Sequence, residues 1–299
     1  MSYRIPLLAL LGLYFVFNPQ QPPAIRFEKD VVYGKVDDIE LKLDIARPAS
    51  GAGPFPAVVW FHGGGWQAGK KSDNHASIRQ LAEQGYIATS VEYRFAPRFP
   101  FPAQIEDAKC AVRYLRAHAK ELNLDPERIG ACGESAGGHL ALMLGLTESK
   151  DGLEGRGGYE EQSSKVQAVV SFVSATDFRK SRKPSPEAEE TVRAYYGGKD
   201  LSQVMREFLG TLDPKAPVMR RVSPITYVHS GAPPILTFYG DSDPFVPVEQ
   251  GRLLDKALKK AGVETTMVVV KGGGHGWTGK DKERTDRMAL AFLDKHLKK

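Results

Sequence analysis

Hydrophobic and polar residues alternate near the start of the chain and then give way to continuous apolar runs. Residues 26–33 and 39–45 alternate around a short turn, which predicts an antiparallel strand pair with one solvated face. The later runs are bounded by turn residues and predict buried strands. These predicted strands cover residues 56–61, 86–93, 128–132, 166–173, 234–239 and 265–270.

Helical spacing separates the predicted strands. In residues 103–122, Ile105, Ala108 and Val112 recur on one face of a helix. Further helices are predicted over residues 135–146, 248–261 and 280–297. Because strands alternate with helices after the leading hairpin, the pattern predicts an α/β fold with a mostly parallel sheet.

Residues 178–226 interrupt this alternation. They are polar, with two short helical stretches at residues 186–195 and 202–209. An insertion of this kind after a strand commonly covers a functional site. We therefore expect one domain over residues 25–299, with a small helical cap at residues 178–226.

The first 24 residues differ from the rest of the chain. Arg4 precedes an apolar run over residues 5–17, and a polar, proline-rich stretch follows. This order is typical of a secretory signal peptide, and the run is shorter than the roughly 20 residues of a transmembrane helix. Prolines crowd the expected cleavage region near Ala24. We expect a secreted or periplasmic protein, with an uncleaved membrane anchor or an N-terminal helix packed on the domain as alternatives.

Composition and charge exclude several classes of protein. The chain has 299 residues, a formal net charge of +5 and two cysteines, Cys110 and Cys132. Two cysteines exclude a disulfide-rich scaffold and a four-cysteine zinc site, and we expect both thiols to be buried and unpaired. The basic residues of the last predicted helix alternate with acidic ones, which indicates a solvated face and not a nucleic-acid surface.

A glycine-flanked serine is the strongest chemical signal. Residues 133–137 read Gly-Glu-Ser-Ala-Gly between a predicted strand and a predicted helix, which is the context of a nucleophile elbow. A strained turn leaves no room for side chains two positions before and after Ser135. The helix N-terminus also favours negative charge developing there. The pattern therefore predicts Ser135 as a nucleophile, and the plainer interpretation is a helix start capped by serine.

A glycine-rich segment follows the strand at residues 56–61. Residues 62–66 read His-Gly-Gly-Gly-Trp, and glycines expose backbone amides that can bind an oxyanion. The amide of Ala136, directly after Ser135, would be the partner donor. Residues 64–70 also fit most of a phosphate-binding loop. Lys71 replaces the hydroxyl residue that such a loop needs for magnesium, which argues against a nucleotide site.

A general base and an acid are expected later in the chain. Of the seven histidines, only His275 and His296 follow both Ser135 and a suitable acid. His296 lies among lysines and is expected to be solvated, so His275 is the candidate base. The order serine, aspartate, histidine fits with either Asp241 or Asp243 as the acid.

The remaining histidines are expected to have other roles. His62 is expected to order the glycine segment, and His139 to pack within the fold one turn after the serine. His118 lies in a predicted helix among charged neighbours. His75 and His229 lie in polar segments with no apparent partner.

These residues predict one reaction type. Ser135 would attack an ester carbonyl, His275 would take and return the proton, and an aspartate would orient the imidazole. The ester would be cleaved through an acyl-enzyme intermediate without a metal or cofactor.

Three motifs carry a family resemblance that runs from about Val31 to the end of the chain. They are HGGGW at residues 62–66, EYRFAP at residues 92–97 with FPA at 101–103, and GESAGGHLA at 133–141. They resemble hormone-sensitive-lipase-like esterases and, equally, the bacterial feruloyl-esterase-like group BD-FAE, both of the α/β-hydrolase superfamily. The acid motif GDSDPFVP at residues 240–247 resembles the second group.

The resemblance implies roles for particular residues. It assigns the acid to Asp243 and the oxyanion donors to Gly64, Gly65 and Ala136. It implies an α/β-hydrolase fold and a carboxylesterase acting on small or polysaccharide-linked acyl esters, of acetyl or feruloyl type. A kynurenine-formamidase-like amidase is an alternative. A non-catalytic binding protein on a hydrolase scaffold is another, although such proteins typically lose a member of the triad.

Aromatic residues are candidates for the lining of the acyl pocket. One set lies in the insertion and the other follows the EYRFAP motif. The candidates are Tyr195, Tyr196, Phe208, Phe95, Phe99 and Phe101. Core packing is the plainer interpretation of both sets.

Overall fold

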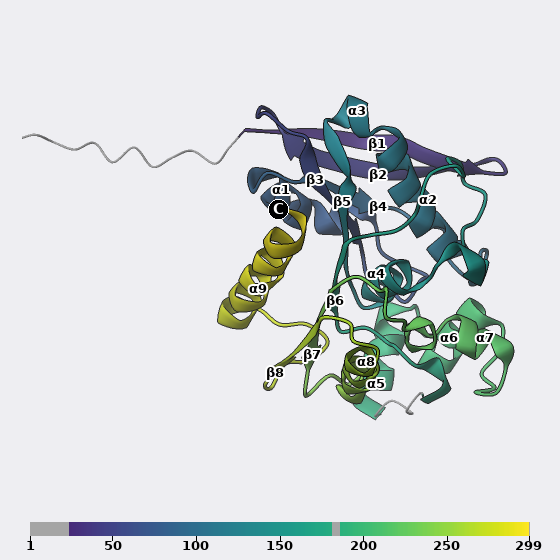
Figure 1. The fold of residues 1–299 in the computed structure, drawn as a ribbon. Coiled ribbons are helices and arrows are strands. Elements are labelled where there is room, and N and C mark those ends of the chain that lie inside the picture. The colour runs from purple at the N-terminus through teal and green to yellow at the C-terminus, as the bar shows by residue number, and fades with distance from the viewer. Residues whose placement is uncertain (1–23, 181–185, 299) are drawn as a thin grey trace, which may run out of the picture.

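The computed structural model describes residues 24–180 and 186–298, and one eight-stranded sheet runs through them (Figure 1). The strand order is β1-β2-β4-β3-β5-β6-β7-β8. β1 (Ile25–Val36) pairs antiparallel with β2 (Ile39–Pro48), and β2 pairs antiparallel with β4 (Ile87–Val91). All later pairings are parallel. The predicted α/β fold with a leading hairpin is therefore confirmed.

The parallel part of the sheet brings distant segments to one edge. Besides β4, it contains β3 (Phe55–Phe61), β5 (Leu124–Glu134), β6 (Ala168–Phe172), β7 (Ile235–Gly240) and β8 (Thr265–Val270). In the register, Phe61 lies opposite Gly133, and Glu134 lies opposite Phe172. The loops after β3 and β5 therefore leave the sheet side by side.

Helices cover both faces of the sheet (Figure 1). Side chains of α2 (Ala103–Ala117), α4 (Ala136–Leu146) and α8 (Glu249–Lys260) belong to one hydrophobic core, and those of α1 (His75–Glu83) and α9 (Gly279–Leu297) belong to the other. Successive residues of β3 alternate between these two cores, as the two-residue period of a strand requires.

Some predicted boundaries differ from the structure. The helix predicted over residues 103–122 breaks at His118 into α2 and α3 (Ala119–Leu122). α1 and α7 (Pro217–Arg221) have no counterpart in the prediction. Short 3-10 turns occupy Lys71–Asn74, Ser149–Asp151, Phe178–Lys180 and Pro224–Tyr227.

The insertion packs against the glycine segment after β3. It contains α5 (Pro186–Tyr195) and α6 (Leu201–Leu209). The ring of Phe208 on α6 stacks on Trp66, with ring centroids 4.2 Å apart and planes 2° from parallel. Gln67 Nε2 also donates a hydrogen bond to the carbonyl oxygen of Val204 at 2.7 Å. The insertion is therefore held against the HGGGW segment by an aromatic stack, and against the next residue by a hydrogen bond.

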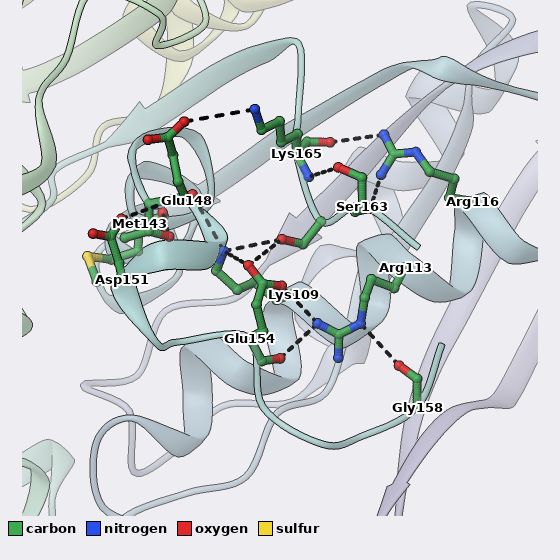
Figure 2. A network of polar contacts seen from close by, with 12 residues as sticks. Lys109, Arg113, Arg116, Met143, Glu148, Asp151, Glu154, Gly158, Ser163 and Lys165 are labelled. Atoms are coloured by element: carbon green, nitrogen blue, oxygen red, sulfur yellow. Dashed lines mark hydrogen bonds and ion pairs between the residues drawn. The ribbon is translucent and has the colours of Figure 1, made fainter. Parts of the chain in front are cut away.

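A buried cluster of charges holds the long connection between α4 and β6. Figure 2 shows Lys109 and Arg113 of α2 reaching Glu154 in this connection, with Lys109 Nζ 2.7 Å and Arg113 Nη1 3.1 Å from its carboxylate oxygens. Arg113 also donates to the carbonyl oxygens of Glu154 and Gly158. Burial lowers the pKa of the Lys109 amine, and the Glu154 carboxylate opposes this effect. The position of the connection on α2 is thus stabilised by the Glu154 carboxylate, which pairs with the cations of Lys109 and Arg113.

Two further expectations concern the cysteines and the N-terminus. Cys110 and Cys132 are buried and free, as expected. The apolar run at residues 5–17 lies outside the described residues. Among the residues that are described, no helix has the length and hydrophobicity needed to span a membrane.

Candidate active site

Ser135 occupies a strained turn between β5 and α4. Its φ is 52° and its ψ is −118°, a conformation that costs a residue with a Cβ of order 1–3 kcal/mol. Its amide donates to the carbonyl oxygen of Phe172 at 2.8 Å, and its carbonyl oxygen accepts from the amide of His139 at 2.9 Å. These bonds hold the serine at the N-terminus of α4.

The flanking glycines are required by close backbone contacts. A Cβ on Gly133 would lie 2.4 Å from the carbonyl group of Gly137, and one on Gly137 would lie 2.1 Å from the carbonyl oxygen of Phe61. Both separations are far shorter than van der Waals contact. The structure therefore has the lack of room that the sequence pattern predicts at these positions.

The structure brings Ser135, His275 and Asp243 together. His275 Nε2 lies 2.9 Å from Ser135 Oγ, and His275 Nδ1 lies 2.8 Å from Asp243 Oδ2. The Asp243 side chain is fully buried, and its Oδ1 accepts hydrogen bonds from the amides of Phe245 and Val246. With its proton on Nδ1, His275 presents a free electron pair at Nε2 to the serine hydroxyl.

Asp241 has a different position. Its Oδ1 accepts a hydrogen bond from the amide of Gly272 at 2.6 Å, and its own amide donates to the carbonyl oxygen of Val270. Asp241 therefore shapes the loop that carries His275. Of the two candidate acids, it is Asp243 that contacts the imidazole.

The glycine segment lies across from Ser135. Gly63, Gly64 and Gly65 line the same cavity as Ser135 and His275, and a Cβ on Gly63 would lie 3.5 Å from Ser135 Cβ. Ala136 is the buried first residue of α4. Of the three predicted oxyanion donors, Gly64 and Gly65 therefore line the cavity that contains Ser135, and Ala136 directly follows Ser135 at the start of α4.

His62 and Tyr93 order the glycine segment. His62 Nδ1 lies 2.7 Å from the carbonyl oxygen of Gly63, and the Tyr93 hydroxyl donates to the carbonyl oxygen of His62 at 2.9 Å. The two rings stack with centroids 4.5 Å apart. Burial lowers the pKa of His62, so the imidazole is neutral. This position agrees with the expectation that His62 orders the loop.

Glu134, which the sequence reasoning missed, ties the loop to the nucleophile turn. Burial raises the pKa of its carboxyl, and the neighbouring Trp60 side chain and Gly63 backbone oppose this effect. The amide group of Asn74 lies 3.2 Å from Glu134 Oε1 and from the amide nitrogen of His62, and both contacts are satisfied when its nitrogen faces Glu134. In the sequence, the one sign of this role was the position of Glu134 directly before the serine.

His139 connects the same loop to α4. Its Nδ1 accepts a hydrogen bond from the Trp66 indole at 3.3 Å, and its Nε2 lies 2.7 Å from the carbonyl oxygen of Val222. Burial lowers the pKa of His139 to about 4, so the ring is neutral and donates to Val222. It packs within the fold, as expected.

For His75 and His296 the sequence-based predictions were wrong. His75 has a partner after all, since its Nε2 lies 2.6 Å from Asp44 Oδ2. His296 is not solvated: its side chain is 6% exposed and lies 3.4 Å from Glu264. Both partners come from segments distant in the sequence, so the local pattern held no sign of them.

The cavity at the triad has a volume of about 450 Å³ and mostly apolar walls. The insertion forms one side of it. The apolar residues of this wall are Val192, Leu201, Val204 and Met205. Tyr195 and Tyr196 also line the cavity, whereas Phe208 packs behind Trp66. Within the described part of the chain, Phe95, Phe99 and Phe101 are absent from the lining.

The sequence matches one protein-family model and is similar to several known esterases. The BD-FAE family model matches residues 43–258. The chain is 31% identical to the esterase LipC of Mycobacterium tuberculosis over 88% of its own length, and 29% identical to the esterase LipQ of the same organism over 89%. These matches cover 62% and 60% of the two relatives, so the chain spans about 60% of their length.

Solved structures match over nearly the whole of both chains. The butyrate-bound esterase 2 of the planctomycete Thermogutta terrifontis has a TM-score of 0.72 and 32% identity, over 90% of this chain and 94% of that one. A truncated carbohydrate esterase from gut microbiota has a TM-score of 0.75 and 27% identity, over 93% and 100%.

Proposed function

The chain belongs to the BD-FAE family, and on that premise we propose that it is a serine carboxylesterase for small or carbohydrate-linked acyl esters. The observation that carries the proposal is the hydrogen-bonded series Ser135–His275–Asp243, whose serine and histidine line a largely apolar cavity. A nucleophile bonded to a base that is itself oriented by a buried acid is the arrangement of acyl transfer.

The proposed reaction has two halves. In the first, Ser135 Oγ attacks the ester carbonyl carbon while His275 Nε2 accepts the serine proton, and the amides of Gly64, Gly65 and Ala136 bind the resulting oxyanion. Collapse of this intermediate breaks the bond to the alcohol, which leaves with the proton from His275. In the second half, water attacks the acyl-serine in the same way and releases the acid. Asp243 stabilises the charged imidazole in both halves.

The cavity supports a small acyl group. Its volume is at the lower end of the range for small-molecule sites, and its walls are mostly apolar. The butyrate bound to the Thermogutta esterase supports a short acyl chain such as acetyl, and the carbohydrate esterase among the structural neighbours supports a carbohydrate alcohol. The feruloyl type is supported by the match to the BD-FAE family. Residues 178–226 act as the cap of the domain at residues 25–299 in this proposal.

Ester hydrolysis can be tested directly. We would measure the turnover of p-nitrophenyl esters from acetate to laurate, methyl ferulate and acetylated xylan by wild type and Ser135→Ala. We expect rapid cleavage of the short esters and a loss on the order of 10⁶ in kcat for the alanine variant. A wild type no faster than Ser135→Ala on every ester would overturn the proposal.

We also propose that the protein is secreted or periplasmic. The support is the apolar run at residues 5–17 behind Arg4. The mass of protein recovered from the periplasm or medium tests this. Export with cleavage predicts a chain lacking roughly the first 20 residues, and an intact chain in the membrane fraction would indicate an anchor.

A further inference from the structure

A tyrosine hydroxyl from the insertion lies over the glycine segment. Tyr196 directly follows α5 and lines the triad cavity. A Cβ on Gly65 would lie 2.3 Å from the Tyr196 hydroxyl oxygen. Because a carbon–carbon bond is about 1.5 Å long, this oxygen lies within roughly 4 Å of the Gly65 Cα. The hydroxyl therefore adjoins one of the proposed oxyanion donors.

This hydroxyl has no partner in the described part of the protein. The ring of Tyr196 meets Tyr195 edge-on, with centroids 4.8 Å apart, and its backbone amide donates to the carbonyl oxygen of Val192. Five other tyrosine hydroxyls donate to protein oxygens and so support the fold. They are those of Tyr33, Tyr86, Tyr93, Tyr227 and Tyr239. Tyr196 is half-buried and lines the cavity, so its hydroxyl is open to a ligand bound there.

The charge state of Tyr196 suits a donor. Burial raises its pKa above the ordinary value, with Tyr195 adding to the effect, so the phenol keeps its proton at neutral pH. A neutral hydroxyl beside a site of developing negative charge can donate a hydrogen bond there without an opposing charge of its own.

We propose that the Tyr196 hydroxyl donates a hydrogen bond to the substrate oxyanion, beside the amides of Gly64, Gly65 and Ala136. This inference rests on the proposed esterase function and adds to it a donor supplied by the insertion. No bond of Tyr196 forms or breaks in the reaction. Its proton stays on the phenol, and its contribution is electrostatic. The insertion then takes part in the chemistry as well as enclosing the acyl group.

A tyrosine away from the cavity offers a matched control. Tyr159 lies in the connection between α4 and β6, is half-buried like Tyr196, and packs edge-on against Tyr114 and His118, outside the described lining of the cavity. Tyr196→Phe and Tyr159→Phe each remove one hydroxyl group and keep the ring, so neither opens a hole in the structure.

The first test compares kcat and KM of both variants with wild type on p-nitrophenyl acetate, p-nitrophenyl butyrate and methyl ferulate. We expect Tyr196→Phe to lower kcat by about 10²-fold on all three, with KM little changed, because an oxyanion donor acts mainly in the transition state. Tyr159→Phe should stay within about twofold of wild type, because its hydroxyl lies outside the cavity.

A second readout separates this role from a structural one. A trifluoromethyl ketone adds to Ser135 and forms a tetrahedral oxyanion, so its Ki should rise in Tyr196→Phe by about the same factor, with the melting temperature unchanged. The inference is overturned if an active wild type and Tyr196→Phe differ by less than about twofold in kcat. It is also overturned if kcat is unchanged and Tyr196→Phe only raises KM, and only for esters of one alcohol, p-nitrophenol or methanol. A wild type without Ser135-dependent hydrolysis overturns the proposed function itself.

Discussion

At the scale of single residues, two neighbouring aspartates have separate partners. Asp243 contacts His275, whereas Asp241 binds the amide of Gly272. Asp243→Asn keeps the size of the side chain but favours the wrong imidazole tautomer, so we expect kcat to fall by about 10⁴. Asp241→Asn still accepts the amide hydrogen bond and should cost less than about tenfold. Turnover of p-nitrophenyl butyrate measures both, and equal losses would place the acid elsewhere.

A second prediction at this scale concerns pH. The pKa of buried His139 is lowered from 6.5 to about 4 in the folded protein. Between these values the unfolded chain binds a proton that the folded chain does not, so stability is lost as the pH falls from 6.5 toward 4. His139→Gln can still accept from Trp66 and donate to Val222 without titrating. Urea unfolding at several pH values should show a smaller loss in this variant, and an identical loss would contradict the prediction.

The chemistry of these residues was readable from the sequence to different degrees. Ser135 and the glycines around it follow from a local motif whose steric reason the structure bears out. The choice of Asp243 over Asp241 depended on a family resemblance, because both residues fit a turn. Glu134 escaped notice because its partners come from β3, the glycine segment and the turn before α1.

At the scale of elements, the spacing of apolar residues predicted the bounds of helices and strands that have a clear pattern of buried and exposed positions. β8 and α5 begin and end where the pattern places them. α1 was missed because only Ile78, Leu81 and Ala82 of its residues are buried, among largely polar neighbours. The break at His118 was missed for another reason. There the backbone leaves helical geometry, at φ −98° and ψ 18°, while the side chain binds the carbonyl oxygen of Tyr114.

The connection between α4 and β6 provides a prediction at the same scale. Glu154→Ala would leave the cations of Lys109 and Arg113 buried without their shared carboxylate. We expect a loss of about 3 kcal/mol in the free energy of unfolding, the lower end of the range for breaking a buried pair, because Glu154 is partly exposed. Arg252→Ala is the control, since its pair with Glu249 is on the surface and should cost less than about 1 kcal/mol. Urea titration checks both, and similar costs would show that the cluster adds little.

At the scale of the whole molecule, the site depends on contacts between distant segments. Ser135 and His275 are 140 positions apart, and the parallel sheet places their loops at one edge. Chain order and strand alternation were enough to predict that meeting. The walls of the cavity could not be predicted in this way, because the spacing of apolar residues does not show against which part of the domain an insertion packs. Tyr196 over Gly65 and Phe208 against Trp66 became visible only in three dimensions.

The packing of the insertion on the glycine segment leads to the last prediction. Phe208 is fully buried and stacks on Trp66, which also lines the cavity. Phe208→Ala should cost about 3–5 kcal/mol of stability and leave Trp66 free to move into the vacated space. The cavity would then widen, and preference among p-nitrophenyl esters should shift toward longer acyl chains. Leu209→Ala removes another buried side chain of α6 that lies away from the cavity lining, so it should lower stability without that shift. Because both variants lose core volume, a common change in acyl preference would mean that general loosening, and not the Trp66–Phe208 stack, sets the size of the acyl pocket.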